Sequence, residues 1–298
     1  MDFKSTEVFD GGVRIKEVKN FETAHIFDCG QCFRWHRQND GSYIGIAYGK
    51  VIQVKKEGSD VIINNTTQDD FNNIWAEYFD LYRDYDLIKE KLSEDPLLRK
   101  SIQFGNGMRI LKQEPFETII SFIISSNNRI PMIKRAIEKI CTAWGQPIEY
   151  NGSIYYSFPD VNSICHAEEK EIENCKTGFR ARYIKDTISK IYVSHNSDNE
   201  EFNPRYIKEL KDDECHSELQ KFRGVGPKVA DCIMLFSMGK YSAFPVDVWV
   251  KRAMMHFYMA PDASLKKIRD FGRNKFKNLS GFAQQYLFYY ARENNIKV

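Results

Sequence analysis

The chain has 298 residues, of which 42% are hydrophobic, 28% charged and 14% aromatic, a balance that excludes disordered and collagen-like chains. The formal net charge of +2 gives by itself no reason to expect a polyanionic partner. At roughly 100 to 200 residues per domain, the length favours two domains.

Nothing in the sequence indicates a membrane protein or an exported one. No apolar run approaches the roughly 18 residues that cross a bilayer. The N-terminus carries Asp2 and Glu7, where a secretory signal has a basic start and an apolar stretch. The seven cysteines are an odd number and widely spaced, which favours a reducing compartment over a disulfide scaffold. We expect an intracellular protein, in the cytoplasm or nucleoid if bacterial, without a membrane partner.

The first third of the chain is predicted to form an antiparallel sheet. Residues 12–65 contain β-branched and aromatic segments, separated by turn signals at residues 39–41, 48–50 and 58–60. Cys29 and Cys32 form a CxxC pair, but no second pair follows at zinc-finger spacing. We therefore expect buried thiols there and no metal.

After residue 69 the apolar residues recur at helical spacing, and this pattern continues to the end except for a polar loop over residues 194–204. The prediction is an α+β protein. An N-terminal antiparallel β-sheet domain, residues 1–104, packs on a larger all-helical domain, residues 105–298. The strongest local motif, at residues 214–238, lies in the helical part.

This motif is two helices joined by a tight glycine turn. In LQKFRGVGPKVADCIMLF, residues 219–236, one helix is expected to end at Gly224-Val225-Gly226 and the next to start at Pro227. Glycines allow close backbone approach, and the unpaired N–H groups of a helix start attract an anion. Such a helix-hairpin-helix grips a phosphate backbone, although a lone GxG between helices is more often a simple turn.

Two charged residues add possible chemistry to this motif. Lys228 lies in the first turn of the second helix, where the helix dipole disfavours an ammonium, and a neutral amine is a nucleophile. Asp247, in FPVDVWVKR at residues 244–252, is expected to cap the following helix. A carboxylate can also stabilise positive charge developing on a sugar, and an amine can trap that sugar as a Schiff base.

At this point the sequence resembles a known family. GVGPKVAD, followed 19 positions after Lys228 by the Asp of PVDV, is similar to the helix-hairpin-helix and Gly/Pro-Asp motif of base-excision DNA glycosylases, and the lysine marks their bifunctional glycosylase/lyase members. Further motifs narrow the resemblance to 8-oxoguanine DNA glycosylases: GQCFRW at residues 30–35, PFETIISFIISSNN at 115–128, GFRARY at 178–183 and GFAQQYLF at 281–288. The resemblance runs over essentially the whole chain.

The resemblance implies that Lys228 attacks the anomeric carbon of the damaged nucleotide and forms a Schiff base, after which β-elimination nicks the strand. Asp247 would stabilise the cationic sugar. The damaged base must first leave the duplex stack. The C-terminal cysteines that hold an iron–sulfur cluster in the endonuclease III branch are absent, because no cysteine follows Cys232. Neither a cluster nor another metal or cofactor is expected.

The resemblance also implies a pocket for the flipped base. Cys232 and Phe288 would pack on its two faces, and Gln284 would read its pairing edge. Gly30 would offer its backbone carbonyl to the purine N–H that 8-oxoguanine has and guanine lacks. The plain alternatives are core residues for Cys232 and Phe288, a surface amide for Gln284 and a simple turn for Gly30.

Other matched positions imply contacts with the DNA strands. Asn127 and Asn128 would fill the gap left by the flipped base, the alternative being a helix C-terminal cap. Arg180 would reach toward the orphaned partner base or a phosphate. Gly224 and Gly226 would face the phosphate backbone.

Three positions depart from the pattern of eukaryotic members. Met132 stands where those members carry an arginine that recognises the unpaired cytosine, and Phe179 stands where they carry a tyrosine that wedges beside it. Trp249 replaces a phosphate-contacting histidine. Methionine cannot donate hydrogen bonds to cytosine, so we expect a non-eukaryotic member with relaxed preference for the opposite base.

The expected partner is double-stranded DNA containing 8-oxoguanine, and the expected state is a monomer. Two alternatives stay open: a non-catalytic helix-hairpin-helix protein that only binds the DNA backbone, and a glycosylase for another damaged base. The charge distribution suits all three, because residues 221–298 hold 14 Lys and Arg against five Asp and Glu, a balance of +9 against −7 for the rest. A concentration of basic residues at the motif favours a DNA footprint over a merely solvated helical face.

Overall fold

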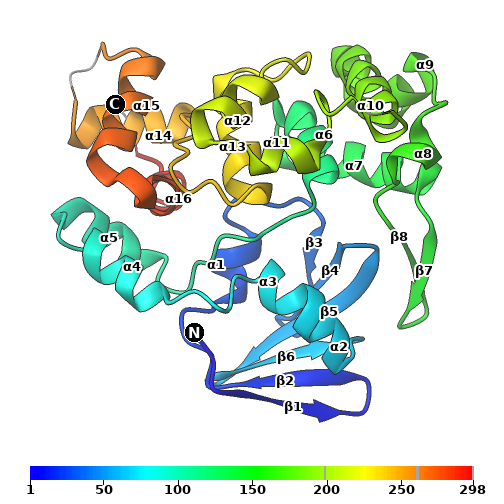
Figure 1. Cartoon of the computed structure of the whole chain (residues 1–298). Coiled ribbons are helices and arrows are strands. Elements are labelled where there is room, and N and C mark those ends of the chain that lie inside the picture. Colours follow the sequence, from blue (N-terminus) through cyan, green and yellow to red (C-terminus); the bar gives the residue numbers. More distant parts are fainter. Residues whose placement is uncertain (198, 260–261, 297–298) are drawn as a thin grey trace.

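The computed structural model describes residues 1–197, 199–259 and 262–296. A twisted sheet forms one end of the molecule and a larger group of helices forms the other (Figure 1). This arrangement confirms the predicted α+β fold class, with an N-terminal antiparallel sheet beside a mostly helical body.

The sheet has six antiparallel strands in the order β1-β2-β6-β5-β4-β3. The strands are β1 (Ser5–Phe9), β2 (Gly12–Lys16), β3 (Trp35–Arg37), β4 (Tyr43–Ala47), β5 (Lys50–Glu57) and β6 (Asp60–Asn64). The turn between β4 and β5 has positive φ at both central residues, 50° at Tyr48 and 71° at Gly49, as a two-residue hairpin requires. The sheet starts earlier than predicted, because β1 precedes residue 12.

The remaining elements are almost all helical. In chain order they are α1 (Thr23–Phe27), α2 (Gln68–Asp70), a π-helical turn (Phe71–Trp75), α3 (Ala76–Tyr78), α4 (Tyr85–Leu92), α5 (Pro96–Phe104), α6 (Pro115–Ser125), α7 (Ile130–Trp144), α8 (Val161–Ile164), α9 (Glu169–Ile172), a second π-helical turn (Glu173–Thr177), a 3-10 turn (Gly178–Arg180), α10 (Ala181–His195), α11 (Pro204–Glu209), α12 (Asp212–Leu219), α13 (Pro227–Ser237), α14 (Val248–Phe257), α15 (Leu265–Phe276), a 3-10 turn (Lys277–Leu279) and α16 (Ser280–Glu293).

Two large hydrophobic cores and a small third cluster hold the described elements together. The smaller core lies between the sheet and the helical segment 68–78, and its centre is the stacked pair Phe27 and Trp35, whose ring centroids are 3.9 Å apart. The larger core fills the helical body and includes residues of α4 and α5. These two helices therefore pack with the helical body although they precede residue 105, and the domain division at residues 104 and 105 stays a prediction.

One expectation is wrong: the chain does not stay helical after residue 69. Strands β7 (Pro147–Tyr150) and β8 (Ser153–Tyr156) form a hairpin within the otherwise helical body. Asn151 and Gly152 both have positive φ, 50° and 68°, which is the two-residue Asn-Gly turn that favours a hairpin. The hairpin descends beside β4 and β5 (Figure 1) and packs on their apolar side chains.

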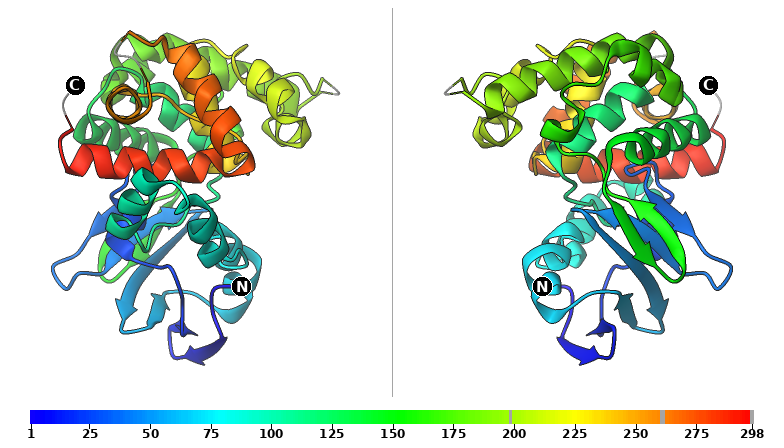
Figure 2. Two further views of the ribbon diagram at one scale, coloured as in Figure 1. Left: turned by 90° about the vertical axis from the view of Figure 1, so that its left-hand side faces the viewer. Right: turned by 90° about the vertical axis from the view of Figure 1, so that its right-hand side faces the viewer.

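The last helix, α16, connects the two parts of the molecule. It runs along the side of the helical body that faces the N-terminal part (Figure 2), and it packs against α5 and α14. No helix among the described residues is long and apolar enough to cross a membrane. A polar loop joins α10 and α11 as predicted, but over the described part of residues 196–203, because α10 extends to His195 and α11 begins at Pro204.

Candidate active site

Lys228 lies in the first turn of α13, at the position that the sequence predicts. Pro227 occupies the first helical position, where a missing N–H costs no hydrogen bond. The Lys228 side chain is half-buried, and its Nζ lies 5.6 Å from the ring centroid of Phe122 in α6. The aromatic ring forms one wall beside the amine and limits the paths by which the amine can be approached.

Asp247 is the N-cap of α14, which confirms the predicted cap. Its Oδ1 accepts hydrogen bonds from the backbone N–H groups of Trp249 and Val250, at 3.0 and 2.8 Å. Burial raises the pKa of Asp247, and the positive charge of Lys228 and the two capping N–H groups oppose this rise. The carboxylate is therefore held in a fixed orientation, largely shielded from water, and close enough to Lys228 to feel its charge.

Cys232 lies one turn after Lys228 and is 3% exposed. Burial raises the pKa of its thiol to about 11, although the charge of Lys228 opposes the rise. At neutral pH the thiol is protonated and a poor nucleophile. This position suits a packing surface next to the lysine.

Gly30 lies in a turn whose other carbonyls are occupied. Its φ is +83°, a conformation that favours glycine. The carbonyls of Cys29 and Gln31 accept hydrogen bonds from side-chain amides, at 3.0 Å from Gln285 Nε2 and 2.7 Å from Gln113 Nε2. Within the described residues no donor is paired with the Gly30 carbonyl. An unpaired acceptor on a fixed turn is what a ligand N–H needs.

Gln284 and Phe288 project from the same face of α16, one turn apart. Gln284 is 3% exposed, and among the described residues its Oε1 has no hydrogen-bond partner. Phe288 is half-buried, and its ring lies 3.2 Å from the place that a Cβ on Gly30 would occupy. A buried amide oxygen without a hydrogen-bond partner costs desolvation free energy in the unliganded protein, and a bound ligand with a matching donor would remove that cost.

The two groups of residues converge. Arg292, on the next turn of α16, lies beside Gly30, and its charge also lowers the pKa of Asp247. Helices α14 and α16 pack together, which brings Asp247 at the start of α14 near α16, and the charge of Lys228 at the start of α13 also lowers the pKa of Asp247. Asp247 thus links Lys228 and Cys232 to the part of α16 that holds Phe288 and Arg292 against Gly30.

The glycine turn before α13 is present but is longer than predicted. Helix α12 ends at Leu219, so residues 220–226 form the connection. Gly224 has φ +84°, and a Cβ there would lie 2.7 Å from a ring atom of Tyr183. A Cβ on Gly226 would meet nothing within 4 Å, and among the described residues no side chain caps α13. The start of α13 is therefore open to an anion.

The residues predicted to fill the gap in the strand lie after α6. Asn127 is exposed with φ +50°, and Asn128 caps α6 by donating to the Ile124 carbonyl at 3.1 Å. Arg180 is 8% exposed and donates to the carbonyls of Ser126, Asn127 and Thr177. Its guanidinium holds the asparagine loop in place and does not extend outward, so its role in this structure is to support the loop.

Two of the three departures from the eukaryotic pattern are exposed. Met132 is 42% exposed in the first turn of α7, and Phe179 is 57% exposed beside Arg180. Trp249 is half-buried, and the guanidinium of Arg252 lies 4.9 Å from its ring centroid. Met132 and Phe179 have no hydrogen-bond donor and offer contact surface only, whereas the indole N–H of Trp249 can still donate.

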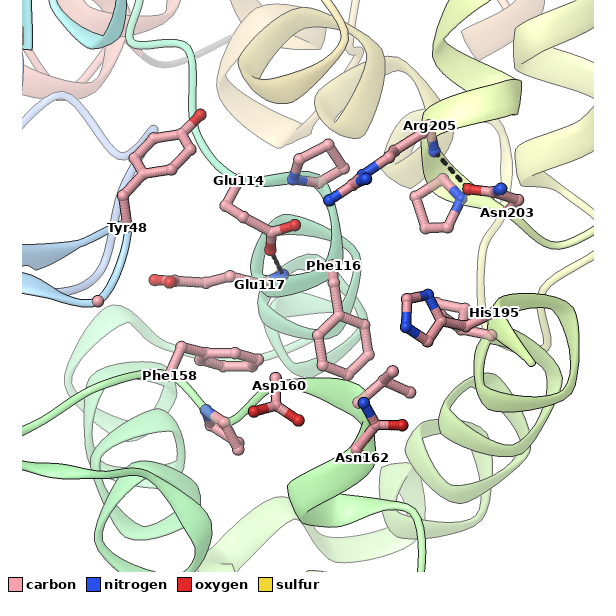
Figure 3. A pocket seen from close by; sticks show the side chains of 16 residues that line it. Tyr48, Glu114, Phe116, Glu117, Phe158, Asp160, Asn162, His195, Asn203 and Arg205 are labelled. Carbon is pink, nitrogen blue, oxygen red and sulfur yellow. Dashed lines mark hydrogen bonds between the residues drawn. The ribbon is translucent and has the colours of Figure 1, made fainter. Parts of the chain in front are cut away.

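A separate cavity of about 420 Å³ contains none of the predicted site residues (Figure 3). Glu114 turns back onto the start of α6 and accepts from the Glu117 N–H at 2.7 Å. Burial raises the pKa of Glu117 to about 7, although the charge of Arg34 opposes the rise.

No group of three or more His, Cys, Asp or Glu in the described parts of the chain could hold a metal ion. Cys29 and Cys32 are both buried thiols, as expected.

Sequence reasoning missed two residues of α16, Gln285 and Arg292. Gln285 is 2% exposed and binds the Cys29 carbonyl, while Arg292 binds the Asp28 carbonyl. The spacing of Gln284, Phe288 and Arg292, four residues each, places them on one helix face and could have indicated the arginine. No sequence signal shows that Gln285 faces the 28–31 turn.

Comparison with known proteins supports the same interpretation. Residues 13–119 match the family described as 8-oxoguanine DNA glycosylase, N-terminal domain, and residues 120–277 match the HhH-GPD superfamily base excision DNA repair proteins. The crystal structure of the Clostridium acetobutylicum 8-oxoguanine glycosylase/lyase, in complex with double-stranded DNA containing cytosine opposite 8-oxoguanine, superposes with a TM-score of 0.96. It is 62% identical, over 99% of this chain and 100% of that one.

Curated relatives agree. The N-glycosylase/DNA lyase of Saccharomyces cerevisiae is 30% identical, over 83% of this chain and 71% of the yeast protein. The N-glycosylase/DNA lyase of Arabidopsis thaliana is 27% identical, over 88% of this chain and 75% of the plant protein. The resemblance inferred from the motifs is confirmed: the chain belongs to the 8-oxoguanine DNA glycosylase/lyase family of base-excision DNA repair proteins.

Proposed function

We propose that this protein removes 8-oxoguanine from double-stranded DNA and then nicks the strand at the resulting abasic site. The observation that carries the proposal is the convergence of a half-buried lysine, a capped carboxylate and an unpaired Gly30 carbonyl at one site. Family membership supports a glycosylase/lyase, and the open start of α13 supports contact with a DNA phosphate.

In the proposed reaction, the Lys228 side chain gives up a proton, and its amine attacks C1′ as the glycosidic bond breaks and the base leaves with the bonding electrons. The base takes up a proton as it departs. Asp247 stabilises positive charge on the sugar, since its carboxylate is fixed by two backbone N–H groups. Opening of the sugar ring yields the Schiff base. Loss of a C2′ proton then expels the 3′ phosphate, and water finally releases the lysine.

Lesion recognition in this proposal depends on one backbone carbonyl. The N7–H of 8-oxoguanine would donate to the Gly30 carbonyl, whereas N7 of guanine would present a second acceptor there. Phe288 and Cys232 would cover the two faces of the base, and the buried Oε1 of Gln284 would accept a hydrogen bond from its pairing edge. A site built around hydrogen bonds strongly rejects an analogue that lacks the matching donor.

Preference for the opposite base is proposed to be weak. Met132 is exposed and has no hydrogen-bond donor, so it offers cytosine only van der Waals contact. Arg180 is engaged with carbonyls of the asparagine loop. Neither side chain distinguishes cytosine from the other bases by hydrogen bonds in this arrangement.

The test is single-turnover excision on duplexes that carry 8-oxoguanine, an alkylated purine or an oxidised pyrimidine, each opposite all four bases. The proposal predicts that 8-oxoguanine is excised fastest and that rates opposite C, A, G and T differ by less than about tenfold, ~1.4 kcal/mol. Faster excision of another lesion would replace the substrate, and a larger preference for C would overturn the relaxed specificity. Binding of all duplexes without excision would favour a non-catalytic DNA-binding protein.

A further inference from the structure

Two polar side chains of α16 face the 28–31 turn and have no part in the chemistry described so far. Gln285 is 2% exposed, and its Nε2 donates to the Cys29 carbonyl at 3.0 Å. Arg292 is 17% exposed at its side chain and donates from Nη2 to the Asp28 carbonyl. These two bonds join residues more than 250 positions apart in the sequence and connect the last helix to the N-terminal part.

The turn is held on both sides of Gly30. Gln285 and Arg292 bind the two carbonyls before it, while Gln113 binds the Gln31 carbonyl after it at 2.7 Å. Gln31 itself is fully buried and is bonded to the Ile26 and Arg109 carbonyls and to the Leu111 N–H. The Gly30 carbonyl is left between these anchors without a partner in the described residues, so its position follows from theirs.

Arg292 touches the other wall of the pocket as well. Its guanidinium carbon lies 5.3 Å from the ring centroid of Phe288, a cation–π contact. Its Nη1 lies 3.2 Å from the place that a Cβ on Gly30 would occupy. Gln284, Phe288 and Arg292 follow one another at four-residue spacing, so the ring lies between the glutamine and the arginine along one helix face. One side chain therefore positions both the ring and the turn.

We propose that Gln285 and Arg292 are positioning residues that set the distance between the Gly30 carbonyl and the Phe288 ring, and so determine discrimination of the damaged base. The inference rests on the proposed function, because it concerns the pocket for 8-oxoguanine. A displacement of about 1 Å in a positioned contact can cost about 10²-fold in rate. Lys228 is held by α13 and not by this turn, and Arg292 acts on the catalytic group only through its charge on Asp247, so the lysine chemistry at a site without a base is largely independent of the pair.

This independence provides the test. Wild type, Arg292→Met and Gln285→Leu are compared in two single-turnover assays: excision of 8-oxoguanine from a duplex, and nicking of a duplex with a preformed abasic site. The inference predicts that excision falls at least tenfold in both variants while nicking of the abasic duplex stays within about threefold of wild type. Affinity for a duplex with a tetrahydrofuran abasic analogue is also predicted to be unchanged.

Three further variants separate positioning from charge and from helix stability. Lys208→Met removes a positive charge from an exposed position of α11, and Glu293→Gln removes the exposed ion-pair partner of Arg292. Both are predicted to excise at the wild-type rate. Arg292→Lys keeps the charge but loses the planar fork, and it is predicted to recover less than half of the lost rate.

Excision at the wild-type rate by both Arg292→Met and Gln285→Leu overturns the positioning role. A parallel loss of excision and abasic nicking also overturns it, since that pattern indicates general loss of structure. If wild type nicks abasic DNA but does not excise 8-oxoguanine, the proposed substrate is wrong and the inference falls with it. If wild type excises 8-oxoguanine and both Arg292→Met and Gln285→Leu excise it equally fast, the positioning inference fails while the proposed function stands.

Discussion

Substitution of Asp247 separates its structural role from its proposed catalytic role. The carboxylate caps α14 through Oδ1 and is also proposed to stabilise the cationic sugar. Asparagine carries an oxygen in the same place and caps helices about as well as aspartate, but it has no charge. Alanine has neither the oxygen nor the charge. Asp247→Asn and Asp247→Ala therefore both lose the charge, but only Asp247→Ala loses the helix cap.

General values for helix caps give the expected size of the structural effect. Loss of the cap in Asp247→Ala is predicted to cost about 1 kcal/mol, up to about 2. With an unfolding entropy of about 2.1 cal/mol/K per residue, a chain of 298 residues loses roughly 1.6 °C of Tm per kcal/mol. Asp247→Asn keeps the cap and removes a buried charge. Because burial raises the pKa of Asp247, its contribution to stability is present at low pH and is lost as the pH rises through that pKa. At pH 8 the asparagine variant is thus expected to be at least as stable as wild type.

Both variants are predicted to lose excision by about 10²-fold or more, the scale on which removal of one preorganised transition-state contact reduces a rate. The assays are thermal unfolding at pH 5 and pH 8 and single-turnover excision of 8-oxoguanine. Excision by Asp247→Asn within tenfold of wild type would refute the electrostatic role. Equal destabilisation by asparagine and alanine would refute the cap as the source of the stability difference.

Four further predictions follow from single features. Burial raises the pKa of Glu117 to about 7, so the free energy of unfolding of wild type is predicted to fall as the pH rises through about 7. Glu117→Gln has no carboxyl to titrate, and denaturant unfolding of this variant is predicted to lack that fall. Asp2→Ala leaves the fully buried Arg109 guanidinium without its 2.8 Å carboxylate partner and is predicted to cost about 3 to 5 kcal/mol in urea unfolding. Met132→Arg adds donors at an exposed position and is predicted to raise the excision ratio of C over A above that of wild type. Affinity for a lesion duplex, measured by anisotropy between 50 and 200 mM salt, is predicted to fall steeply because of the basic segment 221–298, and a flat salt profile would contradict that footprint.

The elements of the fold that could be predicted are those marked by a local sequence signal. The hairpins of the N-terminal sheet follow turn residues, and α13 begins at a proline after a glycine turn. The hairpin β7–β8 carries the same kind of signal at Asn151-Gly152, but its strands are only four residues long and too short for a clear alternating pattern. Its stability comes from packing on the sheet, which local sequence does not encode.

In the site, too, some residues could be placed from local sequence and others depend on the tertiary fold. Lys228, Asp247 and Cys232 lie within 20 residues of one another, so helix spacing and capping rules place them correctly. The contact of Gly30 with Phe288 joins two ends of the chain, and only the resemblance to a family indicated it. Gln285 and Arg292 were missed because their partners are backbone carbonyls, whose availability depends on the tertiary fold.

The central claim is that the Lys228 amine forms a covalent intermediate with DNA, and borohydride trapping tests it most directly. Wild type, Lys228→Gln and the exposed-lysine control Lys208→Gln are incubated with an 8-oxoguanine duplex and borohydride, and the adducts are separated by denaturing electrophoresis and mapped by mass spectrometry. The account predicts a trapped complex for wild type and the control, attached at Lys228, and none for Lys228→Gln. An adduct at another residue, or equal trapping by Lys228→Gln, would contradict it.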